Sequence, residues 1–334
     1  MKRKSLYLTG PHQVEIKEEQ FDPPNSNEVL VKVLFSSISA GTEMLLYRKQ
    51  IENNVPLDTK IEDLSEKFQY PLKYGYSTVG KITSIGNNVD QKWKNQTVFS
   101  FHPHESHFTA SPEKLFPLPD EVTEKEATFL PHLETAINLV MDGCPLIGEN
   151  VTIIGQGVIG LLTTYLLSKF PLSKLVTLEP YSMRRNFSEK IGADEVLDPK
   201  EAKKSFEKEI PLKQGSDLTY EISGNPSTLE LAIDLTRFDG KIIIGSWYGN
   251  KKNSLNLGSE FHRNRIKISS SQVSTIKPNY SGRWNRNRRI NLCWEMIKNS
   301  DFEQLVTHEI PIERGEEAYR LIDKKQENVL QVLL

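Results

Sequence analysis

Residues Val151–Leu162, which read VTIIGQGVIGLL, decide how the middle of this chain folds. A mostly apolar run, VTII, comes first, three glycines follow within six positions (155–160), and a second apolar run completes the stretch. A short apolar run that ends at closely spaced glycines predicts a buried strand that turns sharply into a helix. That helix should begin near Gly157.

The same alternation continues to about residue 270, where short apolar runs and helical patterns follow one another. It is typical of parallel strands joined by crossover helices. The expected strands are VTII (151–154), KLVTL (174–178), EVLD (195–198), DLTYEIS (217–223) and KIIIG (241–245). The expected helices are 157–169, 182–191, 200–208 and 226–236. This part of the chain is therefore predicted to be α/β.

The first 130 residues show a different pattern, in which short apolar strands are separated by Gly, Asn and Pro turns. The clearest strands are 29–33, 80–86 and 97–101, and the polar stretch 49–68 is interpreted as an insertion. With 334 residues and 37% hydrophobic content, the chain can build two cores. We expect a β-rich domain beside the α/β domain.

The spacing Gly155-x-Gly157-x-x-Gly160 fits a dinucleotide when it lies between a strand and a helix. Gly155 permits the tight turn, Gly157 lets the backbone approach a pyrophosphate, and Gly160 lets the helix pack on the strand. The free N–H groups at the start of the helix favour the anion. The sequence therefore predicts a dinucleotide cofactor.

The next strand ends at Glu179, whose carboxylate can accept hydrogen bonds from a ribose 2′-OH and would repel a 2′-phosphate. This favours NAD(H). Arg184 and Arg185 follow closely, and a guanidinium there could pair with that phosphate or stack on adenine. NADP(H) therefore stays open as the second choice, with Arg184 as a cofactor contact.

Composition limits the partners. The 42 Lys and Arg residues nearly balance the 44 Asp and Glu residues, which gives a net charge of −2 and no global field for nucleic acid or an anionic membrane. Only two cysteines, Cys144 and Cys293, fit a reducing compartment. The N-terminus lacks a signal-peptide apolar region, and the uncharged stretch 150–168 fits a strand, turn and helix better than a membrane span. We expect a cytoplasmic protein with a small-molecule substrate.

Further segments share an order along the chain with one family. They are SISAGTEMLLYR (37–48), YPLKYGYSTVGKITSIG (70–86), FPLPDEVTEKEATFLPHLETAINLV (116–140), IIGQGVIG (153–160), KIGADEVLD (190–198), EISGNP (221–226) and FDGKIIIGSWYG (238–249). On these segments the whole chain resembles the medium-chain dehydrogenase/reductase superfamily, the zinc-type alcohol dehydrogenases. The SxSAGTE and Gly-Tyr pattern is most similar to the branch of bacteriochlorophyllide hydroxyethyl dehydrogenase-like proteins, although that substrate is not carried over.

The resemblance implies a Rossmann doubly wound parallel sheet, residues 138–284, inserted in a GroES-like β-rich catalytic domain, residues 1–137 and 285–334. It also implies a homodimer. Thr135 would face the nicotinamide carboxamide. The remaining implied cofactor contacts are Val158, Ile159 and Gly245.

The sequence departs from this family at the zinc ligands. The three ligand positions hold Ala40, Tyr76 and Pro131, and none of these is a good Zn²⁺ ligand. The structural-zinc lobe is replaced by FSFHPHESHF (99–108). Three histidines in and beside that segment, at 102, 104 and 107, offer an alternative metal site, but separate packing roles are the commoner outcome. We expect no zinc.

Without zinc, hydride transfer still needs a group that protonates or stabilises the oxyanion. Tyr76 is the leading candidate, with Thr42 at the family's hydroxyl relay position and His132 beside the third lost ligand. An equally weighted alternative is that Tyr76 only fills the space left by the metal. Glu43 is expected to hold the fold.

The sequence thus predicts a zinc-independent NAD(P)-dependent oxidoreductase that moves hydride to or from a carbonyl or alcohol carbon. One alternative is an enoyl or quinone reductase. Another is a dinucleotide-binding sensor or nucleic-acid binder without turnover, which would use the basic segments 262–267 and 281–289. The charge balance does not favour nucleic acid, and the same segments raise the question of an anionic substrate.

Overall fold

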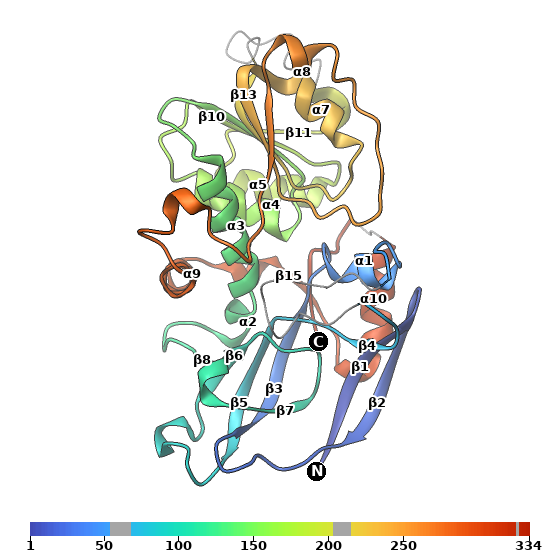
Figure 1. The fold of residues 1–334 in the computed structure, drawn as a ribbon, viewed down its shortest axis with the longest axis vertical. Coiled ribbons are helices and arrows are strands. Elements are labelled where there is room, and N and C mark those ends of the chain that lie inside the picture. Colours follow the sequence, from blue (N-terminus) through green and yellow to red (C-terminus); the bar gives the residue numbers. More distant parts are fainter. Residues whose placement is uncertain (54–67, 203–214, 325–326) are drawn as a thin grey trace. The chain divides into compact units, whose positions relative to one another are not determined.

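The computed structural model describes residues 1–53, 68–202, 215–324 and 327–334 (Figure 1). The chain forms two compact units. One consists of Met1–Pro131 together with Ile290–Leu334, and the other is His132–Arg289. No helix in the described ranges combines the length and apolar content that a membrane span requires.

A six-stranded sheet of parallel strands forms the centre of the second unit, in the order β11-β10-β9-β12-β13-β14. Its strands are β9 (Asn150–Ile154), β10 (Lys174–Leu178), β11 (Glu195–Leu197), β12 (Ser216–Glu221), β13 (Thr236–Ile244) and β14 (Lys267–Ser270). The strand order reverses between β9 and β12. Such a reversal places ligands at the carboxyl ends of the strands.

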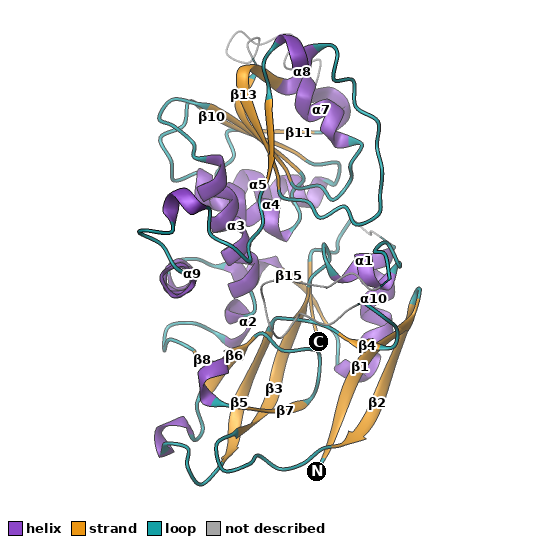
Figure 2. Ribbon diagram, in the orientation of Figure 1, coloured by secondary structure: helices purple, strands orange, loops and turns teal. Residues whose placement is uncertain are grey.

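Helices cover this sheet, as Figure 2 shows. They are α3 (Leu130–Gly143), which begins in the first unit, α4 (Val158–Leu167), α5 (Ser182–Ile191), α7 (Thr228–Leu235) and α8 (Glu260–Arg263). α4 and α5 pack against β9, β10 and β11, and α7 packs against β12 and β13. Buried apolar side chains such as Ile154, Val176 and Ile242 fill the space between the layers. The predicted Rossmann fold is confirmed.

The first unit is rich in β-structure. A three-stranded sheet has the order β2-β1-β4, and a larger sheet has the order β15-β16-β3-β5-β6-β8, with β7 also paired to β3. The strands are β1 (Lys2–Gly10), β2 (Gln13–Gln20), β3 (Val29–Ile38), β4 (Leu72–Lys73), β5 (Thr78–Ile85), β6 (Thr97–Ser100), β7 (His107–Ala110), β8 (Phe116–Pro117), β15 (Val306–Glu309) and β16 (Gln331–Leu333). This unit has the expected GroES-like β-rich character.

The helices of the first unit are short or peripheral. They are α1 (Glu43–Tyr47), α2 (Glu124–Ala127), α9 (Arg286–Lys298), whose first turn belongs to the second unit, and α10 (Gly315–Asp323). Short 3₁₀ helices occur in both units at Gln91–Trp93, Pro112–Lys114, Pro278–Tyr280, Phe302–Leu305 and Ile312–Arg314. α1, β1 and α10 surround a core that includes Leu6, Met44 and Tyr319.

The expected strands and helices of the second unit lie where they were predicted, with ends shifted by a few residues. The prediction missed β14, and in the first unit it missed the hairpin β1–β2. The predicted helix 200–208 and insertion 49–68 fall largely outside the described residues.

Candidate active site

The glycine turn between β9 and α4 has three positions with different steric demands. Gly155 has φ 99°, a left-handed conformation that glycine adopts without strain. A Cβ at Gly160 would stand 2.0 Å from the Gly155 carbonyl oxygen, so only glycine fits there. At Gly157, a Cβ would meet nothing within 4 Å. The turn therefore needs two glycines for its own packing and leaves open space beside the third.

That open space lies at the start of α4. Gly157 is the N-cap and offers no side chain to the first N–H groups of this helix, and Val158 and Ile159 are half-buried in its first turn. Free N–H groups and the helix dipole together attract an anion. The arrangement fits the pyrophosphate of a dinucleotide.

Glu179 follows the last residue of β10 and is buried, with 3% of its surface exposed. One carboxylate oxygen accepts the N–H of Gln156 at 2.8 Å, and the other accepts the N–H of Tyr181 at 3.1 Å. Each oxygen keeps a lone pair for a ribose hydroxyl. Glu179 therefore also stabilises the glycine turn, a role that the sequence pattern did not reveal.

The two arginines after β10 differ in what they contact. The Arg184 guanidinium lies 5.1 Å from the centre of the Tyr181 ring. Arg185 donates to the carbonyl oxygens of Glu179 and Pro180 at 2.8 and 2.7 Å. Arg185 thus fixes the end of β10, while Arg184 stays the candidate for a cofactor contact.

Gly245 follows β13, and its N–H donates to the carbonyl oxygen of Glu221 at 2.9 Å. The buried Glu221 carboxylate stabilises the loops after β12 and β13 by accepting hydrogen bonds from Ser223, Thr228 and Tyr248. The loops that follow β12 and β13 are therefore tied together at the carboxyl end of the sheet.

His132 and Thr135 lie on α3, His132 buried and Thr135 half-buried. Between them, Glu134 accepts two hydrogen bonds from the buried Arg289, at 3.1 and 2.8 Å, and the same arginine donates to Asn138 at 2.6 Å. Arg289 is the last residue of the basic segment 281–289, for which a solvated basic face was the commoner expectation. That expectation is wrong for this residue, because two side chains of α3 and the Val273 carbonyl oxygen hold it in a buried position.

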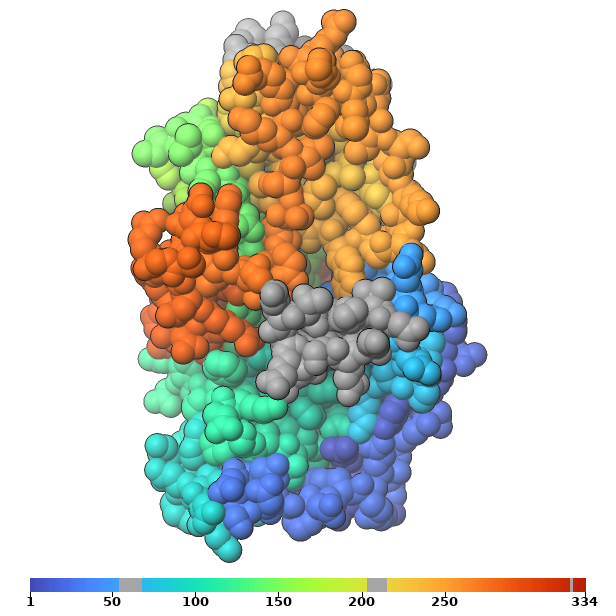
Figure 3. All heavy atoms as spheres, in the orientation of Figure 1, coloured from blue at the N-terminus to red at the C-terminus, as the bar shows by residue number. Residues whose placement is uncertain are grey.

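The rest of that basic segment is exposed, as the dark-orange surface of Figure 3 shows. Arg288 lies 4.2 Å from the centre of the Trp284 ring and donates to the Arg283 carbonyl oxygen. In segment 262–267, most residues are exposed and Ile266 is buried. Lys267 begins β14, so the segment also supplies an edge strand.

A cluster of hydroxyl groups marks the first unit. The half-buried Tyr76 donates its hydroxyl to Ser39 Oγ at 2.5 Å, and Thr42 Oγ1 lies 3.4 Å from the same hydroxyl. Burial raises the pKa of the Tyr76 phenol to about 12, although the hydrogen bonds with Ser39 and Thr42 lower it. The phenol is therefore protonated at neutral pH. The structure brings Tyr76 and Thr42 together, and Ser39, which was not predicted, is the closer partner of Tyr76.

Comparisons with known proteins agree with this architecture. Residues 158–286 match the sequence model of the zinc-binding dehydrogenase family. D-Guloside 3-dehydrogenase of Escherichia coli (strain K12) is 26% identical over 350 residues, which cover 98% of this chain and 99% of that protein.

Solved structures share the whole fold. The rspB alcohol dehydrogenase of Escherichia coli CFT073, complexed with NADH, has a TM-score of 0.77 at 18% identity over 100% of this chain and 99% of that one. An NADP-bound dehydrogenase of Sinorhizobium meliloti 1021 has a TM-score of 0.76 at 15% identity, with 100% and 99% coverage. On these similarities the chain resembles the medium-chain dehydrogenase/reductase superfamily. It is an oxidoreductase.

At the three zinc-ligand positions of the superfamily, this chain has Ala40, Tyr76 and Pro131, whose side chains are a methyl group, a phenol and a pyrrolidine ring. Ala40 is exposed, Tyr76 is hydrogen-bonded to Ser39, and Pro131 is buried. The matched segment 158–286 contains none of these three positions. Within the described part of the chain, no three His, Cys, Asp or Glu side chains gather closely enough to hold a metal ion. This donor set does not fit zinc.

The three histidines at and near the replaced zinc lobe have separate environments. His102 stacks on Phe108 with ring centres 3.9 Å apart and contacts Glu105 at 2.9 Å. His104 is buried against Glu43, and His107 contacts Ser106 at 3.1 Å. The structure therefore does not bring the three imidazoles to one centre.

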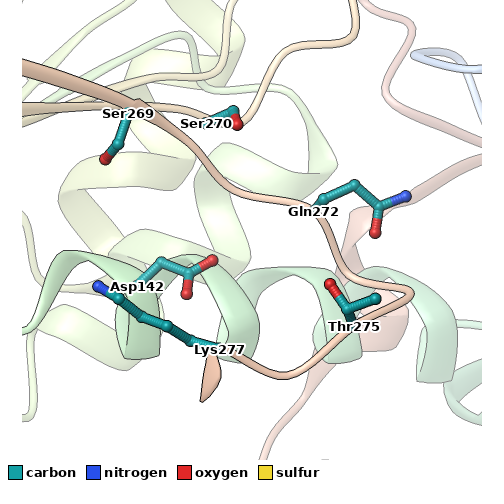
Figure 4. Close-up of a pocket in the computed structure, with 6 residues that line it drawn as sticks. All are labelled: Asp142, Ser269, Ser270, Gln272, Thr275 and Lys277. Carbon is teal, nitrogen blue, oxygen red and sulfur yellow. The ribbon is translucent and has the colours of Figure 1, made fainter. Parts of the chain in front are cut away.

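A pocket of about 270 Å³ lies beside α3 and the segment that follows β14 (Figure 4). It is lined by polar side chains of Asp142, Ser269, Ser270, Gln272, Thr275 and Lys277. Asp142 already accepts hydrogen bonds from Asn138 at 2.9 Å and Ser271 at 2.7 Å. None of the predicted site residues lines this pocket, and we assign it no role in the medium-chain dehydrogenase reaction.

Proposed function

We propose that this protein is a zinc-independent, nicotinamide-dependent dehydrogenase of small hydroxylated substrates, and that Tyr76 transfers the proton at the substrate oxygen. One observation carries the proposal. Where relatives of this superfamily hold a metal ligand, this chain holds a phenol that is hydrogen-bonded to Ser39 and lies beside Thr42. A positioned phenol can do by proton transfer what a Lewis acid does by polarisation.

A bound nicotinamide dinucleotide would supply or accept the hydride. The free N–H groups of α4 and the open space at Gly157 suit its pyrophosphate. The Glu179 carboxylate favours NAD(H) over NADP(H), because it accepts hydrogen bonds from a ribose hydroxyl and repels a phosphate. Solved structures of this fold contain NADH or NADP, so the choice rests on Glu179.

In the reducing direction, the carbonyl carbon gains a hydride while Tyr76 gives its proton to the carbonyl oxygen. In the oxidising direction, the deprotonated Tyr76 would accept the proton of the alcohol, and a bound oxidised nicotinamide would supply the hydride acceptor. A phenol with a pKa of about 12 is protonated at neutral pH, which suits the proton donor. Alcohol oxidation should therefore accelerate as the pH rises toward 12.

The substrate we propose is a secondary alcohol of a sugar-like molecule or the corresponding ketone. The relative that aligns along nearly the whole chain is a D-guloside 3-dehydrogenase. An anionic substrate is not part of the proposal, since Arg289 is already paired with Glu134 and Arg288 stacks on Trp284. The homodimer stays a prediction. So does the assignment of residues 138–284 to a cofactor-binding domain and of residues 1–137 and 285–334 to a catalytic domain.

The first test replaces Tyr76 with phenylalanine, which keeps the ring and removes only the hydroxyl. Loss of one positioned proton donor should lower kcat by about 10²–10⁴-fold. Rates are measured with methyl D-guloside and NAD⁺ or NADP⁺, and with a simple enone and NADH or NADPH. The dissociation constant of NADH, measured by fluorescence, should not change.

Tyr70→Phe is the matched control, because the Tyr70 phenol also has its pKa raised to about 12 by burial but donates to the Leu46 carbonyl oxygen outside the hydroxyl cluster. This variant should keep its kcat. A fully active Tyr76→Phe protein would move the proton transfer to another group. One zinc per chain, with activity lost on chelation and restored by zinc, would overturn zinc independence.

A further inference from the structure

Glu43, His104 and Tyr319 form a buried group of ionisable side chains in the first unit. This group contacts the hydroxyl cluster of Tyr76, Ser39 and Thr42 through Ser39. Glu43 and His104 are both 0% exposed, and His104 Nε2 lies 3.0 Å from Glu43 Oε2. The buried Tyr319 donates its hydroxyl to the same carboxylate oxygen. On the far side of the imidazole, His104 Nδ1 lies 2.7 Å from Ser36 Oγ. A buried carboxylate is costly unless its oxygens are satisfied, and these partners satisfy them.

The other oxygen of this carboxylate reaches the hydroxyl cluster. Glu43 Oε1 accepts the backbone N–H of Ser39 at 2.7 Å, and Ser39 Oγ accepts the hydroxyl of Tyr76 at 2.5 Å. Glu43 therefore holds the residue that provides the acceptor for Tyr76. Since its contact is with the backbone N–H, no proton passes from the Ser39 hydroxyl to Glu43 through this bond.

The imidazole holds the other partner. Gly75 precedes Tyr76 and has φ 128°, and a Cβ there would stand 2.9 Å from two atoms of the His104 ring. The backbone N–H of His104 also donates to the Tyr74 carbonyl oxygen at 3.3 Å. The ring thus packs directly on the backbone that leads into Tyr76. The buried pair of Glu43 and His104 therefore holds both partners of the hydrogen bond between Tyr76 and Ser39, Glu43 through the Ser39 N–H and His104 through the backbone before Tyr76.

We infer that Glu43, in its buried pair with His104, is a positioning residue that fixes the Tyr76 hydroxyl for proton transfer. This inference rests on the proposed function of Tyr76. It extends the expectation that Glu43 stabilises the fold, because the local structure that Glu43 stabilises sets the position of the Tyr76 hydroxyl. Glu43 itself touches neither the substrate nor the cofactor.

The experiment is a double-mutant cycle with Glu43→Gln and Tyr76→Phe. Glutamine has one acceptor oxygen in place of two, so it cannot serve Ser39, His104 and Tyr319 together. If Glu43 acts through Tyr76, Glu43→Gln lowers kcat about tenfold in the wild-type background and less than about twofold beside Tyr76→Phe. The KM for methyl D-guloside and the NADH dissociation constant should stay unchanged.

Glu105→Gln is the matched control, because Glu105 is a buried carboxylate of the same unit that pairs with Lys73 and Arg3 and does not contact the hydroxyl cluster. Its effect should be the same factor in both backgrounds. If Glu43→Gln does not fold, Tyr319→Phe takes its place in the cycle, since it removes one donor to the carboxylate and keeps the ring.

The outcomes separate the two proposals. Suppose that Glu43→Gln lowers kcat by the same factor in both backgrounds and that Tyr76→Phe alone is impaired. This result would overturn the positioning role of Glu43 and leave the proposed function standing. A fully active Tyr76→Phe protein would overturn the proposed proton transfer by Tyr76 and the positioning role with it, and would leave the zinc-independent dehydrogenase to a proton donor elsewhere.

Discussion

Glu179 has two tasks at the end of β10, and they can be separated. Its oxygens accept the N–H groups of Gln156 and Tyr181, and we propose that its charge selects against a 2′-phosphate. Alanine would remove both the hydrogen bonds and the charge. Glutamine removes the charge and keeps one acceptor oxygen, which can still accept the Gln156 N–H of the glycine turn, while the acceptor for the Tyr181 N–H is lost.

We therefore predict that Glu179→Gln narrows the preference for NADH over NADPH while the glycine turn stays folded. The two dissociation constants are measured by fluorescence titration, and the melting temperature checks the turn. Glu179→Ala should weaken both cofactors, because the turn loses its acceptor. A wild-type protein that binds NADPH about tenfold more tightly than NADH, a difference of about 1.4 kcal/mol, contradicts the assignment.

Some residue roles followed from the sequence, and others required the fold. The different demands on Gly155, Gly157 and Gly160 follow from local chain geometry, so their spacing predicts them. The partners of Glu43 do not, since His104 lies between β6 and β7 and Tyr319 lies on α10, and both are distant in sequence from Glu43. Ser39 was missed because a serine in a loop carries no distinctive pattern.

At the scale of secondary structure, the start of α4 offers a pair of glycines with opposite steric surroundings. Gly157→Ala places its new methyl group in open space at φ −69°, so we expect a stable fold. The methyl group stands where the pyrophosphate would approach, and NADH binding should weaken about tenfold or more. NADH fluorescence and thermal unfolding give the two measurements.

Gly160→Ala is the comparison variant. Its methyl group would overlap the Gly155 carbonyl oxygen, and this backbone atom cannot move away as a flexible side chain can. We expect a lower melting temperature even without cofactor. Undiminished NADH binding by a folded Gly157→Ala protein would contradict the proposed cofactor site.

The strands that the sequence predicted best are the ones that are buried on both faces. β9 and β10 read as continuous apolar runs because helices cover both sides of a parallel sheet. β14 lies at the sheet edge and its residues are mostly exposed, so the sequence KISS has no apolar run to mark it. The hairpin β1–β2 was missed for a similar reason, because no residue of β2 is buried and half of its residues are charged.

At the scale of the whole molecule, acid stability depends on a charge cluster in the first unit. Partial burial would raise the pKa of Glu19, but its hydrogen bonds from Lys73, Tyr7 and Ser5 lower it to about 2. A carboxyl whose pKa is lowered by folding stabilises the protein above its unfolded pKa. That stabilisation is lost as the pH falls from about 4.5 toward 2.

We predict that Glu19→Gln lowers the free energy of unfolding at pH 7 by at most about 3 kcal/mol and flattens its decrease toward pH 3. Urea unfolding at the two pH values measures both effects. Glu18→Gln is the control. Glu18 lies on β2 beside Glu19 and forms an exposed ion pair with Lys2 of β1. Exposed pairs contribute little, so this variant should follow the wild type. Identical acid profiles for both variants would contradict the role of Glu19.

The interrupted course of the first unit has a consequence for the order in which a ribosome lets this protein fold. β3 pairs with β16, and the Ser36 N–H donates to the carbonyl oxygen of Leu334, so this sheet joins residues from both sides of the inserted unit. His132–Arg289 is continuous and can fold as soon as it emerges. The first unit cannot be completed until β16 is synthesised, and until then Ser37 and Ile38 at the end of β3 lack this partner strand. During translation the cofactor-binding unit can therefore mature before the unit that carries Tyr76.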